Sequence, residues 1–330
     1  MLEFLKDKTI LVTGGTGSFG KNFVKYLLDN TEAKKIIVFS RDELKQSQMQ
    51  SDLKYDNRLR FFLGDIRSIR RLQRAFNGVD IVVHAAALKQ VSTLEYNPFE
   101  AVQTNILGSQ NVIDAALDNE VAKVILISTD KASQPANLYG STKLCAEKLF
   151  ISGNAYSGGN TKFSCVRYGN VIGSRGSVID KLLRKESLNI TNIEMTRFWI
   201  SLEQSFKLVL YAIENMERGE IFIPKLPSMK LIDLFEAIEP GVTRKESGIL
   251  PGEKIHEVLI STEEARHAVE LDNCFVILNE FTAAPEIYKK YYEHGKKLDN
   301  NFCYTSDNNK DWLTKEQLCA IINSIKEKNK

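Results

Sequence analysis

Short runs of β-branched and aliphatic residues alternate with longer amphipathic stretches through the first half of the chain. The amphipathic stretches, such as Phe19–Asp29 and Ser68–Phe76, are long enough to form crossover helices. This alternation predicts an α/β fold, a doubly wound parallel sheet with helices on both faces. Ligands of such sheets bind at the carboxyl ends of the strands. The expected strands are Thr9–Val12, Lys35–Phe39, Leu59–Leu63, Asp80–Val83, Lys123–Ile127 and Lys162–Arg167.

The alternation weakens after about Gly169. Gln204–Asn215 has the pattern of a helix and Gly219–Pro224 that of a strand, which can return to the main sheet. We therefore expect a nucleotide-binding domain over residues 1–170, rejoined at about 200–225. A smaller C-terminal substrate-binding lobe is expected from residues 171–199 and 226–330.

The composition is that of an ordinary globular protein, with 330 residues of which 43% are hydrophobic and 26% charged. The net charge of +2 gives no reason to expect nucleic acid or an anionic membrane as a partner. The 5 cysteines lack the close spacing of metal ligands, so we expect reduced thiols and no metal site. The apolar run after Lys8 is too short for a signal peptide, and no stretch approaches the roughly 20 apolar residues of a membrane span. These features favour a cytoplasmic protein.

A glycine-rich turn follows the first expected strand. Gly14 allows a tight turn, Gly17 lets a diphosphate approach the backbone, and Gly20 lets the next helix pack closely on the strand. The free N–H groups and the positive end of the helix dipole then face the phosphates. Turns between a strand and a helix often carry glycine, but the position of this one indicates a Rossmann-type dinucleotide site. The expected contacts are Gly14, Thr16, Gly17, Ser18, Phe19 and Gly20.

The end of the second strand bears on which dinucleotide binds. An NAD site usually has a carboxylate here for the ribose 2′-hydroxyl. This chain has Ser40 and Arg41, followed one helical turn later by Lys45. A guanidinium suits a 2′-phosphate because it forms charge-assisted bidentate bonds. Asp42 and Glu43 are adjacent and are explained by the start of a helix, so we expect NADP rather than NAD.

Further strand ends complete the expected cofactor pocket. Asp65 and Ile66, after the third strand, are placed to contact adenine. The small side chains of residues 85–87 leave room for ribose and diphosphate, although tight packing explains them equally well. The remaining expected contacts are Ala85, Ala86, Ala87, Tyr139, Lys143 and Val171.

The residues that carry the expected chemistry follow the fifth strand. Tyr139 and Lys143 are four positions apart on a predicted helix, so both side chains reach a ligand above the same edge of the sheet. A neighbouring ammonium and an oxidised nicotinamide favour phenolate, which lowers the tyrosine pKa from its ordinary value of about 10. Thr129 is placed to hydrogen-bond the same substrate oxygen. Such a pair alone is more often an exposed helix pair, but its position after the glycine turn and the fifth strand favours catalysis.

These features together resemble the extended short-chain dehydrogenase/reductases. Asp130 and Lys131 narrow the resemblance, because the 4-epimerases and reductases of that superfamily usually have small or hydroxyl residues there. The chain is similar to the inverting UDP-N-acetylglucosamine 4,6-dehydratases, hydro-lyases that begin pseudaminic acid biosynthesis in bacteria. The similarity covers nearly the whole chain, from the glycine turn to Trp312. Its strings are Ser40-Arg-Asp-Glu-Leu-Lys-Gln46, Ser128-Thr-Asp-Lys-Ala132, Arg167-Tyr-Gly-Asn170, Gly173-Ser-Arg-Gly-Ser-Val178, Met195-Thr-Arg-Phe-Trp-Ile200 and Gly252-Glu-Lys254.

The resemblance implies a role for each residue of the catalytic segment. Tyr139, assisted by Lys143, takes the proton from O4 while hydride leaves C4 for the cofactor. Lys131 removes H5, which the 4-keto group acidifies, and Asp130 protonates the departing O6. Hydride then returns to C6, and reprotonation of C5 from the opposite face gives an L-arabino product. Lys131 must be neutral when it acts; nearby cations lower its pKa, whereas Asp130 raises it.

The resemblance also implies contacts to a UDP-sugar, with UDP-N-acetylglucosamine as the expected substrate. Three departures from the family pattern lie outside the catalytic segment. Gln90-Val91-Ser92 replaces His-Val-Pro, Ile179-Asp180-Lys181 replaces Pro-Phe-Phe, and Leu250 replaces an arginine that could anchor the diphosphate or uridine. These changes bear on substrate identity and C5 stereochemistry more than on reaction type. The implied contacts are Lys89, Asn105, Asn170, Ser174, Arg175, Thr196, Asn308 and Asn309, while Arg197 fits a ligand contact or an internal salt bridge equally well.

Two other functions fit parts of the pattern. A UDP-sugar 4-epimerase or 4-keto reductase would have the same fold, and Asp130 and Lys131 argue against it. A non-catalytic NADP-binding regulator would usually have lost the pair formed by Tyr139 and Lys143. By analogy with the superfamily we expect a homo-oligomer, whose size the sequence does not determine.

Overall fold

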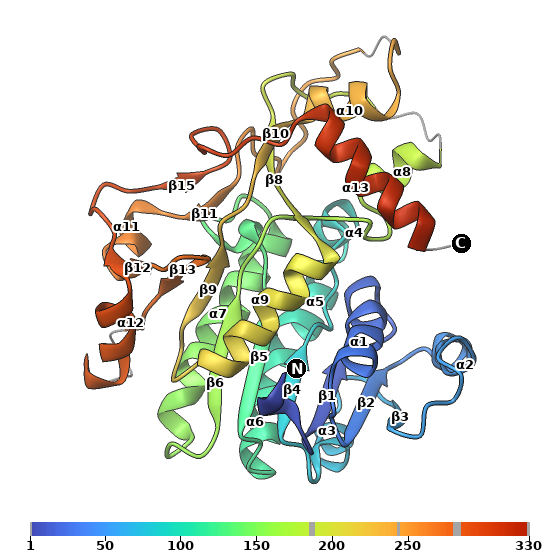
Figure 1. Cartoon of the computed structure of the whole chain (residues 1–330), viewed down its shortest axis with the longest axis vertical. Helices are drawn as coiled ribbons and strands as arrows, with labels where there is room; N and C mark the ends of the chain where they lie inside the picture. The colour runs from blue at the N-terminus through green and yellow to red at the C-terminus, as the bar shows by residue number, and fades with distance from the viewer. Residues whose placement is uncertain (1, 185–188, 243–244, 280–284, 329–330) are drawn as a thin grey trace.

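A computed structural model describes residues 2–184, 189–242, 245–279 and 285–328 (Figure 1). Within these ranges the chain forms a ten-stranded sheet, seven of whose strands are parallel. The order reverses between β1 and β4, as in a doubly wound fold, so the predicted fold class is confirmed. Across the sheet the parallel strands are β3 (Leu59–Leu63), β2 (Lys35–Ser40), β1 (Thr9–Thr13), β4 (Ile81–His84), β5 (Lys123–Ile127), β6 (Lys162–Val166) and β9 (Ile221–Pro224).

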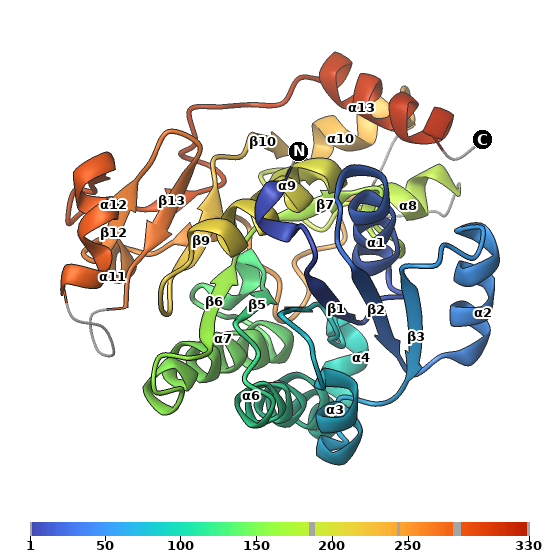
Figure 2. The ribbon, with the colours of Figure 1, turned by 60° about the horizontal axis from the view of Figure 1, so that its bottom comes forward.

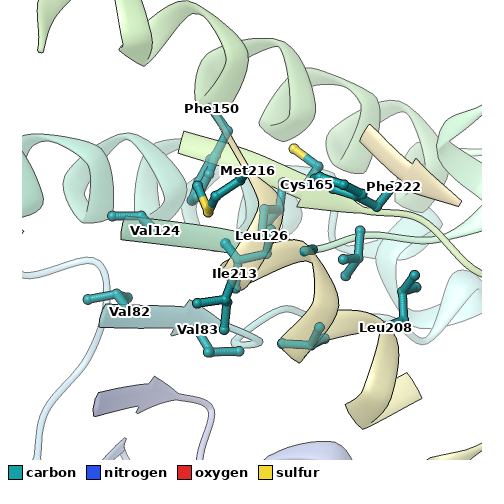
Figure 3. Close-up of a cluster of buried hydrophobic side chains, with 14 of the residues drawn as sticks. Val82, Val83, Val124, Leu126, Phe150, Cys165, Leu208, Ile213, Met216 and Phe222 are labelled. Carbon is teal, nitrogen blue, oxygen red and sulfur yellow. The ribbon is translucent and has the colours of Figure 1, made fainter. Parts of the chain in front are cut away.

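Helices cover both faces of this sheet (Figure 2). On one face lie α1 (Ser18–Asn30) and α9 (Leu202–Asn215), and on the other α3 (Ile69–Phe76), α6 (Gly108–Asp118) and α7 (Leu138–Tyr156). Between them, apolar side chains from β4, β5, β6 and β9 meet those of α7 and α9 in a close-packed core (Figure 3). The strands read as continuous apolar runs because both of their faces are buried. The remaining helices of this half are α2 (Glu43–Asp52), α4 (Val91–Tyr96), α5 (Pro98–Ala101) and a π-helical turn (Val102–Leu107).

Three antiparallel strands continue the sheet beyond β9. They are β13 (Cys274–Ile277), β12 (Ala268–Glu270) and β14 (Lys296–Lys297), in that order. These three strands were expected in the lobe, so part of the expected lobe extends the nucleotide-binding sheet instead. Two short helices precede these strands in the chain: α11 (Thr262–Ala265) comes before β12, and α12 (Lys289–His294) comes before β14.

A smaller lobe lies above the carboxyl end of the main sheet (Figure 1). It has its own apolar core, which includes Met195, Trp199, Phe235 and Leu318. Besides the ten-stranded sheet, the described residues form a three-stranded sheet in the lobe and a two-stranded sheet of β11 (Val258–Ile260) and β15 (Tyr304–Thr305). No helix in the described ranges is long and apolar enough to span a membrane. The elements of the lobe are β7 (Asn170–Ile172), β8 (Thr196–Ser201), β10 (Ser228–Lys230), α8 (Val178–Leu183), α10 (Leu231–Ile238) and α13 (Lys315–Lys328).

Candidate active site

The glycine-rich turn between β1 and α1 is packed too tightly to accept side chains. Gly14 has a φ of +65°, and a Cβ there would lie 2.8 Å from the Cα of Ala86. A Cβ on Gly20 would lie 2.6 Å from the Cα of Gly15, so α1 begins directly against the turn. The N-cap residue of α1 is Gly17, and no side chain caps the helix there. The N–H groups of the first turn are therefore available to an anion.

A cavity of about 520 Å³ lies beside this turn. Most of the expected cofactor contacts line it: Gly14, Thr16, Gly17, Ser40, Arg41, Lys45, Asp65, Ile66, Ala85, Ala86 and Ala87. Phe39, Asp42, Gly64 and Thr104 line it as well and were not among the expected contacts. Six expected contacts are not in its lining: Ser18, Phe19, Gly20, Tyr139, Lys143 and Val171. Phe19 instead packs on Phe206 of α9, with ring centroids 5.5 Å apart.

Two cations at this cavity are each paired with a carboxylate. Arg41 Nη1 lies 3.5 Å from Asp65 Oδ2, and Lys45 Nζ lies 2.6 Å from Asp42 Oδ2. Asp42 also caps α2 by accepting the Lys45 N–H at 3.0 Å, and these bonds to Lys45 lower the pKa of the Asp42 carboxyl. Ser40 accepts a hydrogen bond of 3.0 Å from Gln46. A 2′-phosphate would therefore compete with Asp42 and Asp65 for the two cations.

The segment between β5 and α7 is fixed by side-chain caps. Thr129 begins a 3₁₀ helix and accepts the Lys131 N–H at 3.4 Å, while Asn137 begins α7 and accepts the Gly140 N–H at 2.9 Å. A Cβ on Gly140 would collide with the backbone carbonyl oxygen of Lys131. The absence of that Cβ lets the first turn of α7 pack on the 3₁₀ helix, which brings Tyr139 beside Lys131.

Tyr139 and Lys143 lie on the same turn of α7 but have different partners. Tyr139 forms a hydrogen bond with Thr129, and Lys143 Nζ donates a bond of 2.8 Å to the carbonyl of Ile127. Burial raises the pKa of Tyr139 to about 12, although the charge of Lys131 acts in the opposite direction. Burial also lowers the pKa of Lys143 to about 8. Burial thus outweighs the nearby positive charge at Tyr139, and the lowering of its pKa expected from an oxidised nicotinamide stays a prediction.

The amino group of Lys131 lies among three acceptors. It is 3.1 Å from Asp130 Oδ1, 3.3 Å from Glu257 Oε1 and 3.4 Å from Asn170 Oδ1. Both carboxylates are buried, whereas the lysine side chain is 25% exposed. Burial lowers the pKa of Lys131, but Asp130 and Glu257 raise it more, so the net shift is upward. The sequence analysis expected cations to lower the pKa of this lysine and Asp130 to raise it, and the effect of the carboxylates is the larger one.

Glu257 is a candidate active-site residue that the sequence analysis did not identify. It immediately precedes β11, and its carboxylate lies 3.7 Å from Arg197 Nε and 4.0 Å from Lys254 Nζ. In the part of the chain that the structure describes, four buried polar side-chain atoms have no hydrogen-bond partner: Ser128 Oγ, Asp130 Oδ2, Glu257 Oε2 and Trp199 Nε1. Two of these belong to the carboxylates that flank Lys131. A buried polar atom without a partner costs free energy, so such a pair marks a functional cluster.

The expected substrate contacts separate into two groups. Lys89, Asn170 and Arg175 lie near the glycine-rich turn, which is the candidate cofactor turn, or near the group formed by Asp130, Lys131, Tyr139 and Glu257, which is the candidate catalytic cluster. Asn170 accepts from Lys131, and Lys89 donates to the Arg175 carbonyl at 3.4 Å. Arg175 in turn donates to the Thr16 carbonyl at 3.0 Å, so this lobe residue reaches the cofactor turn. Ser174, next to Arg175, belongs to the same loop, in which it accepts the Ser177 N–H.

The other expected contacts have partners within the protein. Asn105 is buried and bonds the backbone of Leu88 and the hydroxyl of Thr142. Thr196 is buried against His256 and Ser306. Asn308 and Asn309 bond neighbouring backbone: Asn308 donates to Cys303, and Asn309 donates to Leu226 and Asp311. Arg197, which the sequence left open, donates to the carbonyls of Thr196, Lys254 and Ile255 and faces Glu257, so it is an internal partner.

The three departures from the family pattern lie at the start of α4, in α8 and in the loop before β11. Gln90 begins α4, and its side-chain nitrogen lies beside Gly176. Asp180 accepts the Gly176 N–H at 2.6 Å and pairs with Arg184 at 2.9 Å, so it closes the loop before α8. Leu250 is half-exposed and its N–H donates to Glu253.

Comparison with known proteins agrees with this arrangement. A family model described as "Polysaccharide biosynthesis protein" matches residues 10–279. The chain is 48% identical over 326 residues to the UDP-N-acetylglucosamine 4,6-dehydratase (inverting) of Campylobacter jejuni subsp. jejuni serotype O:23/36 (strain 81-176), covering 96% of this chain and 97% of the relative. It is 40% identical over 342 residues to the UDP-glucose 4-epimerase of Rickettsia canadensis (strain McKiel), covering 98% of each. Among solved structures, Pen from Bacillus thuringiensis superposes with a TM-score of 0.87 at 39% identity, covering 98% of this chain and 99% of that one.

These similarities extend over the glycine turn, the catalytic segment and the lobe. The chain is as long as its relatives, because nearly all of each one is covered. The family resemblance drawn from the motifs is thereby confirmed. The chain belongs to the polysaccharide biosynthesis protein family, within the extended short-chain dehydrogenase/reductases.

Proposed function

We propose that this protein is a UDP-N-acetylglucosamine 4,6-dehydratase that inverts the configuration at C5. One observation carries the proposal: Asp130 and Lys131, an acid and a base, lie in the same buried cluster as Tyr139. A 4-epimerase needs only the tyrosine, whereas a dehydratase must also remove H5 and protonate the departing O6. The 48% identity with a relative named for this activity supports the choice of sugar nucleotide.

The cavity beside the glycine turn fits a nicotinamide dinucleotide. The turn has no room for side chains, and the open end of α1 faces it. Such a dinucleotide, when bound, supplies a hydride acceptor for C4 and a hydride donor for C6. Arg41 and Lys45 in the lining support NADP over NAD, because both can bind a 2′-phosphate.

Tyr139 is placed to accept the O4 proton. The Thr129 hydroxyl holds its phenol, and the positive charge of Lys131 favours the phenolate. Lys143, anchored to the end of β5, keeps a second buried cation on the same turn of α7. General acid–base groups of this kind contribute about 10²- to 10⁴-fold each.

Asp130 and Lys131 serve the elimination. Burial raises the pKa of the Asp130 carboxyl and the charge of Lys131 lowers it, with a net upward shift to which Glu257 contributes, so this carboxyl takes up a proton more readily than an ordinary aspartate. Transfer of one proton from Lys131 Nζ to Asp130 Oδ1, across 3.1 Å, produces both reactive forms at once. The N–H bond of the ammonium breaks and the O–H bond of the acid forms. The neutral amine then removes H5, and the acid protonates O6.

The lobe and the cavity suggest how the sugar nucleotide is held. Lys89, Asn170, Ser174 and Arg175 face the catalytic end of the sheet and are the proposed substrate contacts. By analogy with the superfamily we also propose a cytoplasmic homo-oligomer that serves a pseudaminic acid type of pathway.

Incubation of the purified protein with UDP-N-acetylglucosamine and NADP⁺ in deuterated water tests the proposal. We expect a product that has lost one water, carries deuterium at C5 and has the inverted configuration there. Loss of water with retained configuration would reject inversion but keep dehydration. A product isomeric with the substrate would establish the epimerase alternative, which is the activity named for the Rickettsia relative.

A further inference from the structure

Glu257 reaches the catalytic cluster from the lobe side of the molecule. It stands at the start of β11, far along the chain from the 3₁₀ helix that carries Lys131. Its side chain is 3% exposed, and Oε1 lies 3.3 Å from Lys131 Nζ. Its N–H donates to Ser306 Oγ at 2.9 Å, and the Ser306 N–H donates to its carbonyl at 2.9 Å. The backbone of Glu257 is therefore fixed on both sides, and its carboxylate has a defined position.

Charged groups from three elements face this carboxylate. Arg197 comes from β8, with Nε at 3.7 Å, and Lys254 from the preceding loop, with Nζ at 4.0 Å. Lys131 and, beyond it, Asp130 come from the 3₁₀ helix. Two further cations thus accompany Glu257, while Asp130 has Lys131 as its ion-pair partner within the described residues. Of the two carboxylates beside Lys131, Glu257 has more cations around it, and they lower its pKa.

The difference in charge surroundings between Glu257 and Asp130 becomes important once the lysine proton has moved to Asp130. The ion pair between Asp130 and Lys131 then no longer exists, and the Asp130 proton is directed toward the departing oxygen. The neutral amine still has N–H bonds to donate. Glu257 and Asn170 are the acceptors that remain for them, at 3.3 Å and 3.4 Å.

We propose that Glu257 is the positioning residue that holds the Lys131 amine in place during the elimination. It acts through Lys131, remains ionised and takes no part in oxidation at C4. This inference rests on the proposed dehydratase function. It predicts that loss of Glu257 slows removal of H5 selectively, because a misplaced catalytic group costs on the order of 100-fold.

The test compares Glu257→Gln and Glu257→Ala with the wild type on UDP-N-acetylglucosamine carrying hydrogen or deuterium at C5. We expect kcat to fall about 10- to 100-fold, with KM for the sugar nucleotide nearly unchanged. The isotope effect at C5 should increase, and reduced nicotinamide should accumulate in a single turnover because C4 oxidation outruns elimination. The alanine variant should be more impaired, because glutamine keeps one acceptor oxygen.

Glu220→Gln is the matched control. Glu220 is also fully buried, but it bonds Ser164 and Tyr291 at the opposite end of β9 from the catalytic cluster. Its variant should lose stability while its isotope effect at C5 stays that of the wild type. A Glu257 variant that slows C4 oxidation and elimination equally would overturn the inference in favour of a purely structural role, as would wild-type kinetics. A wild type that forms no dehydrated product would instead reject the proposed function itself.

Discussion

Lys143 donates its hydrogen bond of 2.8 Å to the backbone carbonyl of Ile127, at the carboxyl end of β5. The lysine is 4% exposed, so an ammonium that donates to a backbone carbonyl has been removed from water. Burial lowers its pKa to about 8, even though Glu147 acts in the opposite direction. The cation of a proposed active-site residue is thereby held where it costs stability.

Replacement of Lys143 by Met should increase stability at neutral pH by about 1 to 3 kcal/mol, since one pKa unit corresponds to about 1.4 kcal/mol. The lysine pKa is 10.5 in the unfolded chain and about 8 in the folded one. Below pH 8 both states hold the proton, and the folded state bears the full cost of burial. Between these two pKa values only the unfolded state holds the proton. The free energy of unfolding of the wild type therefore increases with pH relative to that of the variant. Urea unfolding at pH 7 and pH 10 measures the difference.

Lys148→Met, at an exposed position of the same helix, provides the comparison for that measurement. A substitution at that exposed position should leave stability nearly unchanged. A Lys143→Met variant less stable than the wild type at pH 7 would mean that the bond to Ile127 outweighs the cost of burial.

Replacement of Tyr139 by Phe should reduce kcat by about 10²- to 10⁴-fold, because the O4 proton loses its acceptor. Wild-type kcat/KM should increase with pH, since burial holds the tyrosine pKa near 12 and phenolate is the minor form at neutral pH. The phenylalanine variant should lose that dependence. Steady-state kinetics from pH 6 to 10 measures both. Tyr156→Phe, 72% exposed at the end of the same helix, should behave as wild type.

The parts of the site that local sequence determines could be predicted. The glycine turn depends on backbone approach within one strand–turn–helix unit, and Gly14 with its φ of +65° is such a case. Tyr139 and Lys143 share a helical turn, so their common face follows from spacing alone. The carboxyl ends of parallel strands meet at one edge, which is why Arg41 and Asp65 line the same cavity.

The rest depends on how the lobe packs, which no local pattern encodes. Glu257 is a single carboxylate before a short apolar run, and only the pairing of β11 with β15 places it beside Lys131. Asn105 has the polarity of a ligand contact, yet its amide bonds Leu88 and Thr142. A side chain's hydrogen-bonding capacity is visible in the sequence, whereas the identity of its partner is not.

Replacement of Arg41 by Ala should weaken binding of NADP⁺ by about 10- to 100-fold and leave NAD⁺ nearly unaffected, because a hydrogen bond to a charged group contributes about 1.5 to 3 kcal/mol. The same variant frees Asp65, whose carboxylate lies 3.5 Å from Arg41, and that charge opposes a phosphate. Calorimetric titration of both dinucleotides measures the ratio of dissociation constants. Arg70→Ala, on α3 and outside the cavity lining, is the control. Equal losses for the two dinucleotides would show that Arg41 does not bind the 2′-phosphate.

A buried charge network joins α7 to α11. Arg167 Nη2 lies 2.6 Å from Glu147 Oε2 and 2.8 Å from Glu264 Oε1, and the side chains of Arg167 and Glu147 are 0% exposed. Arg167 Nη1 also donates to the carbonyl of Leu259 at 2.9 Å. Removing one member of such a network leaves an uncompensated buried charge, whereas removing all of them leaves none.

Arg167→Met should therefore destabilise the protein by about 3 to 5 kcal/mol, because two carboxylates then face each other without a cation. The triple variant Arg167→Met, Glu147→Gln, Glu264→Gln should recover part of that loss, although it removes more groups. Urea unfolding at pH 7 measures both. Lys25→Met breaks the exposed pair with Asp29, in which the side chains are 60% and 55% exposed, and should change stability by less than about 1 kcal/mol. If the triple variant proves less stable than Arg167→Met alone, the attraction within the network exceeds the cost of burying its charges, and the network itself stabilises the junction between α7 and α11.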